Sequence, residues 1–76
     1  MRKKEIPESV KKIGTNIKDI IEVKQYKVRH VAHDADLDIE ALRRYIGGKQ
    51  IMGVDKCIRI AKALNVEVSE LFKGIY

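Results

Sequence analysis

An alternating run of acidic side chains is followed, after two apolar residues, by two adjacent arginines, Arg43 and Arg44. The acids stand at every second position, as Asp34, Asp36, Asp38 and Glu40. Carboxylates at such spacing suggest a calcium-binding loop, which requires glycine at its sixth position and glutamate at its twelfth. Counted from Asp34, those positions hold Ile39 and Tyr45, so we reject a calcium loop.

The other residues that could bind a metal or attack a substrate stand apart from one another. His30 and His33 are three residues apart, and we interpret them as surface residues rather than ligands, because a tetrahedral site needs several spaced Cys or His. Cys57 is the single cysteine, and its apolar neighbours predict a small core residue rather than a reactive thiol. The sequence has no nucleophile–base pair and no glycine-rich phosphate loop. We therefore expect no enzymatic activity, no metal and no cofactor.

Length and charge favour one small basic domain over residues 1–76. The net charge is +5, and it is unevenly distributed. Residues 1–30 carry nine Lys or Arg against four Asp or Glu, and residues 42–76 carry seven against three, whereas residues 31–41 carry four acids and no Lys or Arg. A basic surplus suits a phosphate-rich partner, because each Lys or Arg at a phosphate releases counterions. It also suits simple solubility.

The chain contains no targeting or membrane signal that we can identify. No apolar run approaches the roughly 18 residues that a membrane-spanning helix needs. The basic start Met1-Arg2-Lys3-Lys4 is not followed by the apolar stretch of a secretory signal. We expect a cytoplasmic protein with no membrane association, in which residues 1–7 form a flexible N-terminal arm.

Apolar residues recur at helical spacing along almost the whole chain, which predicts an all-α fold of five short helices. We expect helices over residues 8–25, 28–35, 39–46 and 54–64, and a short fifth helix within 68–75. Their apolar stripes are Val10, Ile13, Ile17, Ile20 and Ile21; Val28, Val31, Ala32 and Ala35; Ile39, Leu42, Tyr45 and Ile46; Val54, Cys57, Ile58, Ala61 and Leu64; and Val68, Leu71, Phe72 and Ile75.

Particular residues mark where these helices begin, end and meet. Asp38 is a good N-cap for the third helix, Gly47-Gly48 end it, and Asn65 ends the fourth. Gly14 lies inside the first helix, where glycine costs up to about 1 kcal/mol relative to alanine. We therefore expect another helix to approach closely at Gly14.

The second and third helices are joined by about three residues, so they must cross steeply, as in a helix-turn-helix. Such a motif would span about 28–47. The positions that pack inward in it are apolar here, namely Val31, Leu37, Leu42 and Tyr45. Ala32 is small enough for the two helices to touch.

From about Ile13 to Phe72 the chain resembles the lambda-repressor and Cro family of Xre-like helix-turn-helix regulators. The matching stretches are Ile13-Gly14-x-x-Ile17, Val31-Ala32, Gly48-Lys49-Gln50, Ile60-Ala61-Lys62-Ala63, Leu64-Asn65-Val66 and Ser69-Glu70-Leu71-Phe72. The chain departs from the family pattern where Lys27 and Val28 replace Ser-Gln, Asp36 replaces Gly, Ile46 replaces Glu and Met52 replaces Pro.

The resemblance implies that the third helix enters the major groove of DNA with its N-terminal half facing the bases. The residues expected at base edges are Asp38, Ile39, Glu40, Arg43 and Arg44. The residues expected at phosphates are Lys27, Val28 and Arg29 at the start of the second helix, and Lys49 and Gln50 after the third. The alternative for the arginines is an ordinary solvated face, with Glu40 and Arg44 forming a helical ion pair.

These features predict a sequence-specific regulator of transcription, a repressor or an activator, that binds double-stranded DNA in a prokaryote or phage. One short domain makes few base contacts, so we expect a homodimer on a pseudo-palindromic operator. The chain shows no separate dimerisation domain, and its candidate dimer residues are Ile51, Met52, Phe72, Ile75 and Tyr76. The alternative is an antitoxin-like module that binds another protein and has weak or lost DNA binding. The acidic run favours that alternative.

Overall fold

A computed structural model describes residues 6–75 of the chain. Within this range the fold is all-helical and has no strand, which confirms the predicted class. It consists of α1 (Glu8–Lys24), α2 (Val28–Asp34), α3 (Ile39–Ile46), α4 (Val54–Leu64) and the 3₁₀ helix η1 (Val68–Phe72). No helix in this part of the chain combines the length and the apolar character needed to cross a membrane. The predicted arm over 1–7 lies mostly outside the described residues, and Pro7 occupies the N-cap of α1.

The fifth element differs from the helix predicted within 68–75, because it is a single stretch of 3₁₀ helix that ends at Phe72. Asn16 on α1 donates its side-chain amide to the carbonyl oxygens of Leu71 and Lys73, both at 2.9 Å. These carbonyls therefore point at α1 and are not free to continue a helix, and Lys73 is already extended, with φ −59° and ψ 135°.

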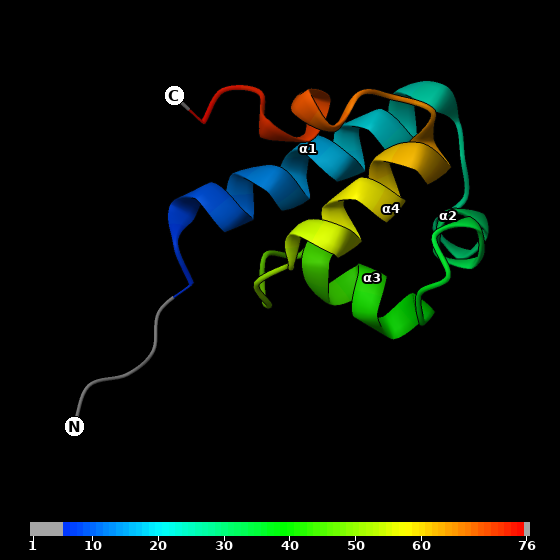
Figure 1. Ribbon diagram of the computed structural model, residues 1–76, viewed down its shortest axis with the longest axis horizontal. Coiled ribbons are helices and arrows are strands. Elements are labelled where there is room, and N and C mark those ends of the chain that lie inside the picture. The colour runs from blue at the N-terminus through cyan, green and yellow to red at the C-terminus, as the bar shows by residue number, and fades with distance from the viewer. Residues whose placement is uncertain (1–5, 76) are drawn as a thin grey trace.

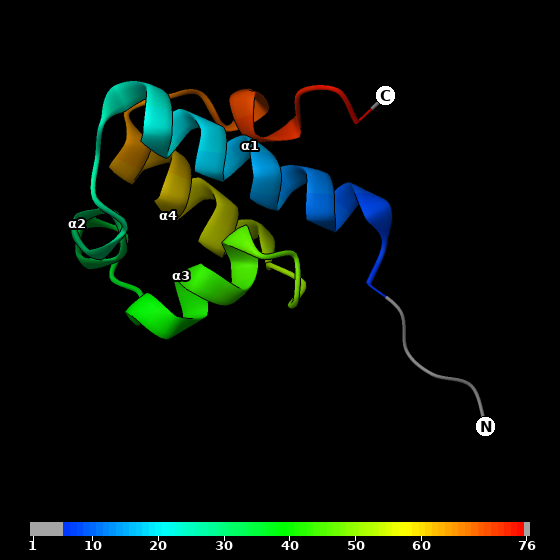
Figure 2. The same cartoon turned by 180° about the vertical axis from the view of Figure 1, so that it is seen from behind.

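The helices are arranged so that η1 and α3 lie at opposite sides of the molecule (Figures 1 and 2). α1 contacts both η1 and α3, while α4 contacts η1 and α2. α2 also contacts α3, which forms the helix-turn-helix pair. One core joins all five elements, and its buried apolar side chains are Ile17, Ile21, Val31, Ala32, Ala35, Leu42, Tyr45, Cys57, Ile60, Ala61, Leu64 and Leu71.

Another helix approaches α1 closely at Gly14, as the sequence predicted, and that helix is α3. Gly14 is buried, and a Cβ atom there would collide with the backbone carbonyl oxygens of Tyr45 and Ile46. The C-terminal end of α3 can therefore rest directly on the backbone of α1. This contact fixes one end of the helix that is the candidate for entering DNA.

The inward face of α4 matches the predicted stripe at Cys57, Ala61 and Leu64 but differs from it at Val54 and Ile58. Cys57, Ile60, Ala61 and Leu64 are buried and share a face at i, i+3, i+4 and i+7. Val54 and Ile58, which we had placed in this stripe, are 76% and 42% exposed. They lie to one side of that face, because Ile60 rather than Ile58 packs inward.

Candidate nucleic-acid interface

The turn between α2 and α3 is a Schellman motif, with the Asp36 backbone in the left-handed conformation at φ 57°. The N–H of Leu37 donates to the carbonyl of Ala32 at 2.8 Å, and the N–H of Asp36 donates to that of His33 at 3.0 Å. Leu37 then packs partly against the core, as predicted. Glycine is the residue that usually takes this conformation, and aspartate is one of the few others that tolerate it.

Arg59 on α4 binds this turn from the side. Its Nε donates to the carbonyl of Ala35 at 3.0 Å, and its Nη2 donates to the carbonyl of Asp36 at 2.6 Å. The same guanidinium lies 3.8 Å from a carboxylate oxygen of Asp36 and 3.8 Å from one of Asp55. Sequence reasoning missed Arg59, because nothing in the local pattern links residue 59 to a turn more than twenty positions earlier.

The two arginines predicted at base edges are both exposed on α3, and each has a side-chain partner. Arg44 donates from Nε to Oε1 of Gln50 at 2.9 Å, which ties the helix to the loop after it. Arg43 Nη1 lies 4.0 Å from Glu40, an i, i+3 pair. The ion pair of Glu40 with Arg44, which the sequence left open as the alternative, does not form, and Glu40 lies beside Arg43 instead.

The remaining predicted base contacts lie at the start of α3. Asp38 occupies the N-cap position with an extended backbone, as predicted, but its side chain makes no capping hydrogen bond. Ile39 is half-buried and packs against the core, whereas Glu40 is exposed. The structure therefore gathers the five predicted base-contacting residues on one short helix and its N-cap.

The residues predicted at phosphates occupy the two ends of the motif. Lys27 is the exposed N-cap residue of α2, Arg29 is exposed in its first turn, and Val28 is half-buried between them. Lys49 and Gln50 are exposed in the loop after α3. No side chain among residues 6–75 caps the N-terminus of α2, so its first backbone N–H groups can reach an anion.

The acidic run lies on the surface of the motif. Asp36 is fully exposed, and Asp34 and Glu40 are 64% and 65% exposed. Each of these three carboxylates lies within 4.0 Å of a basic or imidazole nitrogen, on Arg59, His33 and Arg43. His30 and His33 are both exposed, as predicted. The described residues 6–75 hold no group of three His, Cys, Asp or Glu side chains that could bind a metal.

Three exposed apolar residues follow one another in the loop after α3 and the first half of α4. Ile51, Val54 and Ile58 are all exposed, and Val54 and Ile58 share a face because they are four residues apart in α4. We call these three residues the apolar patch. Of the other candidate dimer residues, Met52 and Phe72 pack partly against the core, Ile75 is half-buried, and Tyr76 lies outside the described residues.

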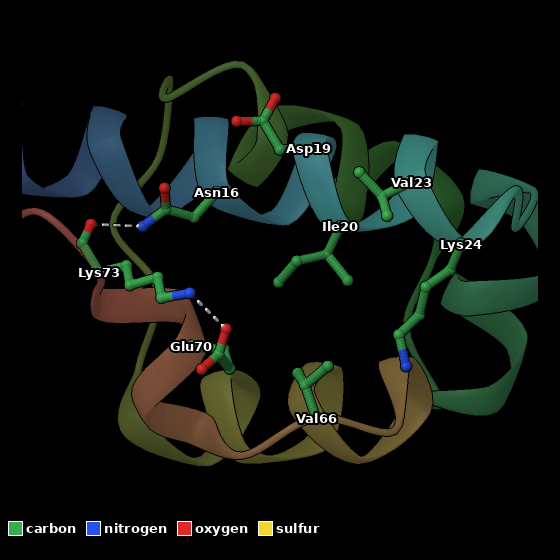
Figure 3. A pocket seen from close by; sticks show the side chains of 8 residues that line it. All are labelled: Asn16, Asp19, Ile20, Val23, Lys24, Val66, Glu70 and Lys73. Atoms are coloured by element: carbon green, nitrogen blue, oxygen red, sulfur yellow. Dashed lines mark hydrogen bonds and ion pairs between the residues drawn. The ribbon is translucent and has the colours of Figure 1, made fainter.

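A groove of about 370 Å³ lies between α1 and the 66–73 segment (Figure 3). The apolar side chains of Ile20 and Val66 face each other across it. The ion pair of Lys73 with Glu70, at 3.1 Å, forms one wall, and Asn16 closes the end. This groove belongs to the α1–η1 side of the molecule, whereas the helix-turn-helix lies on the side of α3 (Figure 1).

Two groups on α4 have shifted pKa values. Burial disfavours the thiolate of Cys57 and raises the pKa of its thiol, with a further contribution from the nearby Asp55 carboxylate. The side chain of Lys56, which donates to Asp55 at 3.0 Å, lowers the pKa of the Asp55 carboxyl group. Cys57 therefore stays a protonated core residue near neutral pH, as its apolar neighbours predicted.

The fold is that of known helix-turn-helix regulators. The structure is similar to the restriction-modification controller protein C.AhdI from Aeromonas hydrophila, with a TM-score of 0.83 and 21% identity over 87% of this chain and all of that one. It is also similar to the clp gene regulator ClgR from C. glutamicum, with a TM-score of 0.81 and 15% identity over 86% and 84% of the two chains. No protein-family model and no curated protein matches the sequence.

Proposed function

We propose that this chain is a transcription regulator that binds double-stranded DNA in a sequence-specific manner through α3. The observation that carries the proposal is the placement of Arg43 and Arg44 on the solvent face of α3, within a fold shared with two regulators. An arginine that bonds to O6 and N7 of guanine contributes about 1–3 kcal/mol of discrimination against other bases. Ile39 can contact a thymine methyl group, and Glu40 can accept from the N4 amino group of cytosine.

Phosphate contacts would fix the motif on the duplex. Lys27 and Arg29 lie at the start of α2, and Lys49 follows α3, so the two ends of the motif each present a cation. The backbone N–H groups near Val28 add the positive end of α2. Such contacts supply affinity without base preference and make binding fall steeply as salt rises.

We infer further that the protein acts as a homodimer on a pseudo-palindromic operator. The three residues of the apolar patch, Ile51, Val54 and Ile58, are 60%, 76% and 42% exposed. Exposed apolar residues that gather beside one another favour a protein interface over a solvated surface. The patch follows the C-terminal end of α3, so a second copy bound there would add a second α3 and a second half-site.

Binding to labelled DNA from the gene's own promoter region tests this proposal. We expect an affinity for the promoter fragment at least about a thousandfold above that for random DNA of equal length, with a steep salt dependence for both. Equal affinities for the two DNAs at every salt concentration would contradict the proposal.

A second candidate is a protein-binding module on the same fold, as in an antitoxin-like partner. The exposed carboxylates of Asp34, Asp36 and Glu40 favour it, because they repel phosphates beside the surface proposed to meet DNA. Affinity purification with the protein as bait, repeated after nuclease treatment, separates the two functions. The protein-binding function would be favoured if a stoichiometric protein partner remains bound after nuclease treatment and no DNA is recovered with the bait before that treatment.

A further inference from the structure

Each of the four α-helices of the described chain ends in the same backbone motif, but the residues at the left-handed position differ. The residues with positive φ after α1, α2, α3 and α4 are Gln25, Asp36, Gly48 and Asn65. The N–H of each of these residues donates to a carbonyl in the last turn of its helix, and the N–H of the next residue donates to the carbonyl one position earlier in that helix. Glycine takes this conformation without strain, asparagine and aspartate tolerate it, and other residues resist it.

The α2 end is the one that sets the geometry of the helix-turn-helix, and it lacks glycine. The Schellman hydrogen bonds there satisfy the carbonyls of Ala32 and His33. The carbonyls of Ala35 and Asp36 lie further along the chain and are not acceptors in these two bonds. Arg59 donates to both of these carbonyls, at 3.0 and 2.6 Å. Its side chain is 35% exposed, so the guanidinium is partly shielded from water, which strengthens both bonds.

We propose that Arg59 is the positioning residue of the helix-turn-helix, which holds the turn at Asp36 and thereby sets how α3 is presented to DNA. The proposal rests on the proposed function. A planar guanidinium with several N–H groups in fixed directions can bond to two carbonyls and lie beside the Asp36 carboxylate at the same time, which an ammonium cannot do in the same geometry. Arg59 thus replaces, by contacts from α4, the conformational preference that a glycine at position 36 would supply.

The proposal predicts that operator binding requires the planar guanidinium of residue 59 and that a positive charge alone at this position is not sufficient. Arg59→Lys keeps the charge, and Arg59→Gln removes it, but both lose the paired hydrogen bonds. We expect each variant to bind a selected operator about tenfold to a hundredfold more weakly than wild type. Affinity for random DNA and the slope of log affinity against log salt should change little, because Arg59 is not itself expected at a phosphate.

The matched control is Lys62→Gln, which removes one positive charge from the same helix at an exposed position. Asp36→Gly is the rescue variant, because glycine favours the left-handed turn without help from Arg59. We expect operator affinity in the Asp36→Gly/Arg59→Gln double variant to recover most of the loss seen in Arg59→Gln alone. A merely stabilising arginine would show no such dependence on the residue at position 36.

The experiment measures operator and random-DNA affinity for these five proteins and the wild type, with hydrogen exchange of the Leu37 amide as a second readout. Faster exchange in Arg59→Lys and Arg59→Gln than in Lys62→Gln supports the proposal, because that amide closes the turn. If the wild type binds the operator and the Arg59→Lys variant binds it equally well, the proposal is overturned. The proposal is also overturned if Asp36→Gly does not restore operator binding to the Arg59→Gln variant. If the wild type shows no preference for the operator over random DNA, the proposed function is contradicted. In that case, Leu37 amide exchange that is no faster in the Arg59 variants than in the wild type overturns the positioning role independently.

Discussion

Arg43 and Arg44 are neighbours in the sequence, but their side chains are held differently. Arg44 donates to Gln50 at 2.9 Å, so part of its guanidinium is already occupied by the loop after α3. Arg43 lies 4.0 Å from Glu40, and both side chains are more than 60% exposed. Exposed ion pairs of this kind contribute little to stability. Arg43 can therefore leave Glu40 for a guanine at small cost, and we consider it the stronger candidate for base contact.

Substitution of Arg43 by alanine should relax base preference. We expect a loss of about 1–3 kcal/mol of discrimination at one base pair of each half-site. Lys49→Ala is the matched control, because a lost phosphate contact weakens binding to all sequences alike and lowers the salt slope by about one. Affinities for an operator and its single-base variants measure both effects. An Arg43→Ala protein with the wild-type pattern of base preference would contradict the assignment.

Gly14 should tolerate no side chain. Gly14→Ala places a methyl group against the carbonyl oxygens of Tyr45 and Ile46, both backbone atoms that cannot rotate away. We expect a loss of about 1–3 kcal/mol in the free energy of unfolding, measured by urea denaturation. Gly47→Ala is the control, because its Cβ would lie 3.4 Å from the carbonyl oxygen of Arg43, an ordinary contact distance. The φ of Gly47 is −78°, which alanine adopts without strain. Equal stability of the two variants would show that α1 and α3 do not meet as described.

The elements were largely predictable from the sequence, because each helix carries its own apolar spacing. The bounds of α3 and α4 agree with the prediction, and α1 and α2 end one residue earlier. The close approach at Gly14 was predictable because a glycine inside a helix needs an explanation. The buried face of α4 was predicted correctly at Cys57, Ala61 and Leu64. Ile58 was predicted there in place of Ile60, because both are apolar and only tertiary packing decides between them.

The side chains that join elements were not predictable. Asn16 bonds to residues 55 and 57 positions later, and Arg59 bonds to residues 24 and 23 positions earlier. Polar side chains that bond to distant backbone carbonyls leave no periodic signal. The candidate DNA-binding residues could be named only because the resemblance assigns the third helix to the major groove, and their contacts with DNA remain predictions.

η1 should depend on Asn16 for its attachment to α1. Asn16 is 8% exposed, and its amide satisfies the carbonyls of Leu71 and Lys73. The Asn16→Ala variant lacks the amide that donates to both carbonyls. We expect this loss to lower the free energy of unfolding by about 1–3 kcal/mol. Hydrogen exchange within 68–72 should also accelerate. Thr15→Ala is the control, since Thr15 is exposed and its hydroxyl donates only within α1, to Lys11; a similar loss in both variants would contradict this role.

At the scale of the whole molecule, the proposed dimer depends on the apolar patch. Val54→Asp places a charge on a residue that is 76% exposed, so the fold should be retained while a dimer that buries this position dissociates. Val23→Asp is the matched control on α1, at a residue that is 82% exposed. Sedimentation at tens of micromolar, with and without DNA, distinguishes the outcomes. We expect a dimer for wild type and Val23→Asp and a monomer for Val54→Asp; a wild-type monomer under both conditions would contradict the dimer.

We propose that this small basic domain recognises particular DNA sequences through α3. Selection of bound fragments from a library of the source genome, at moderate salt, is the decisive experiment. We expect enrichment of one motif with two related half-sites whose centres lie about one helical turn of DNA apart, roughly 34 Å. Recovery of fragments with no shared motif would contradict it, because the basic charge alone would then explain all binding to DNA.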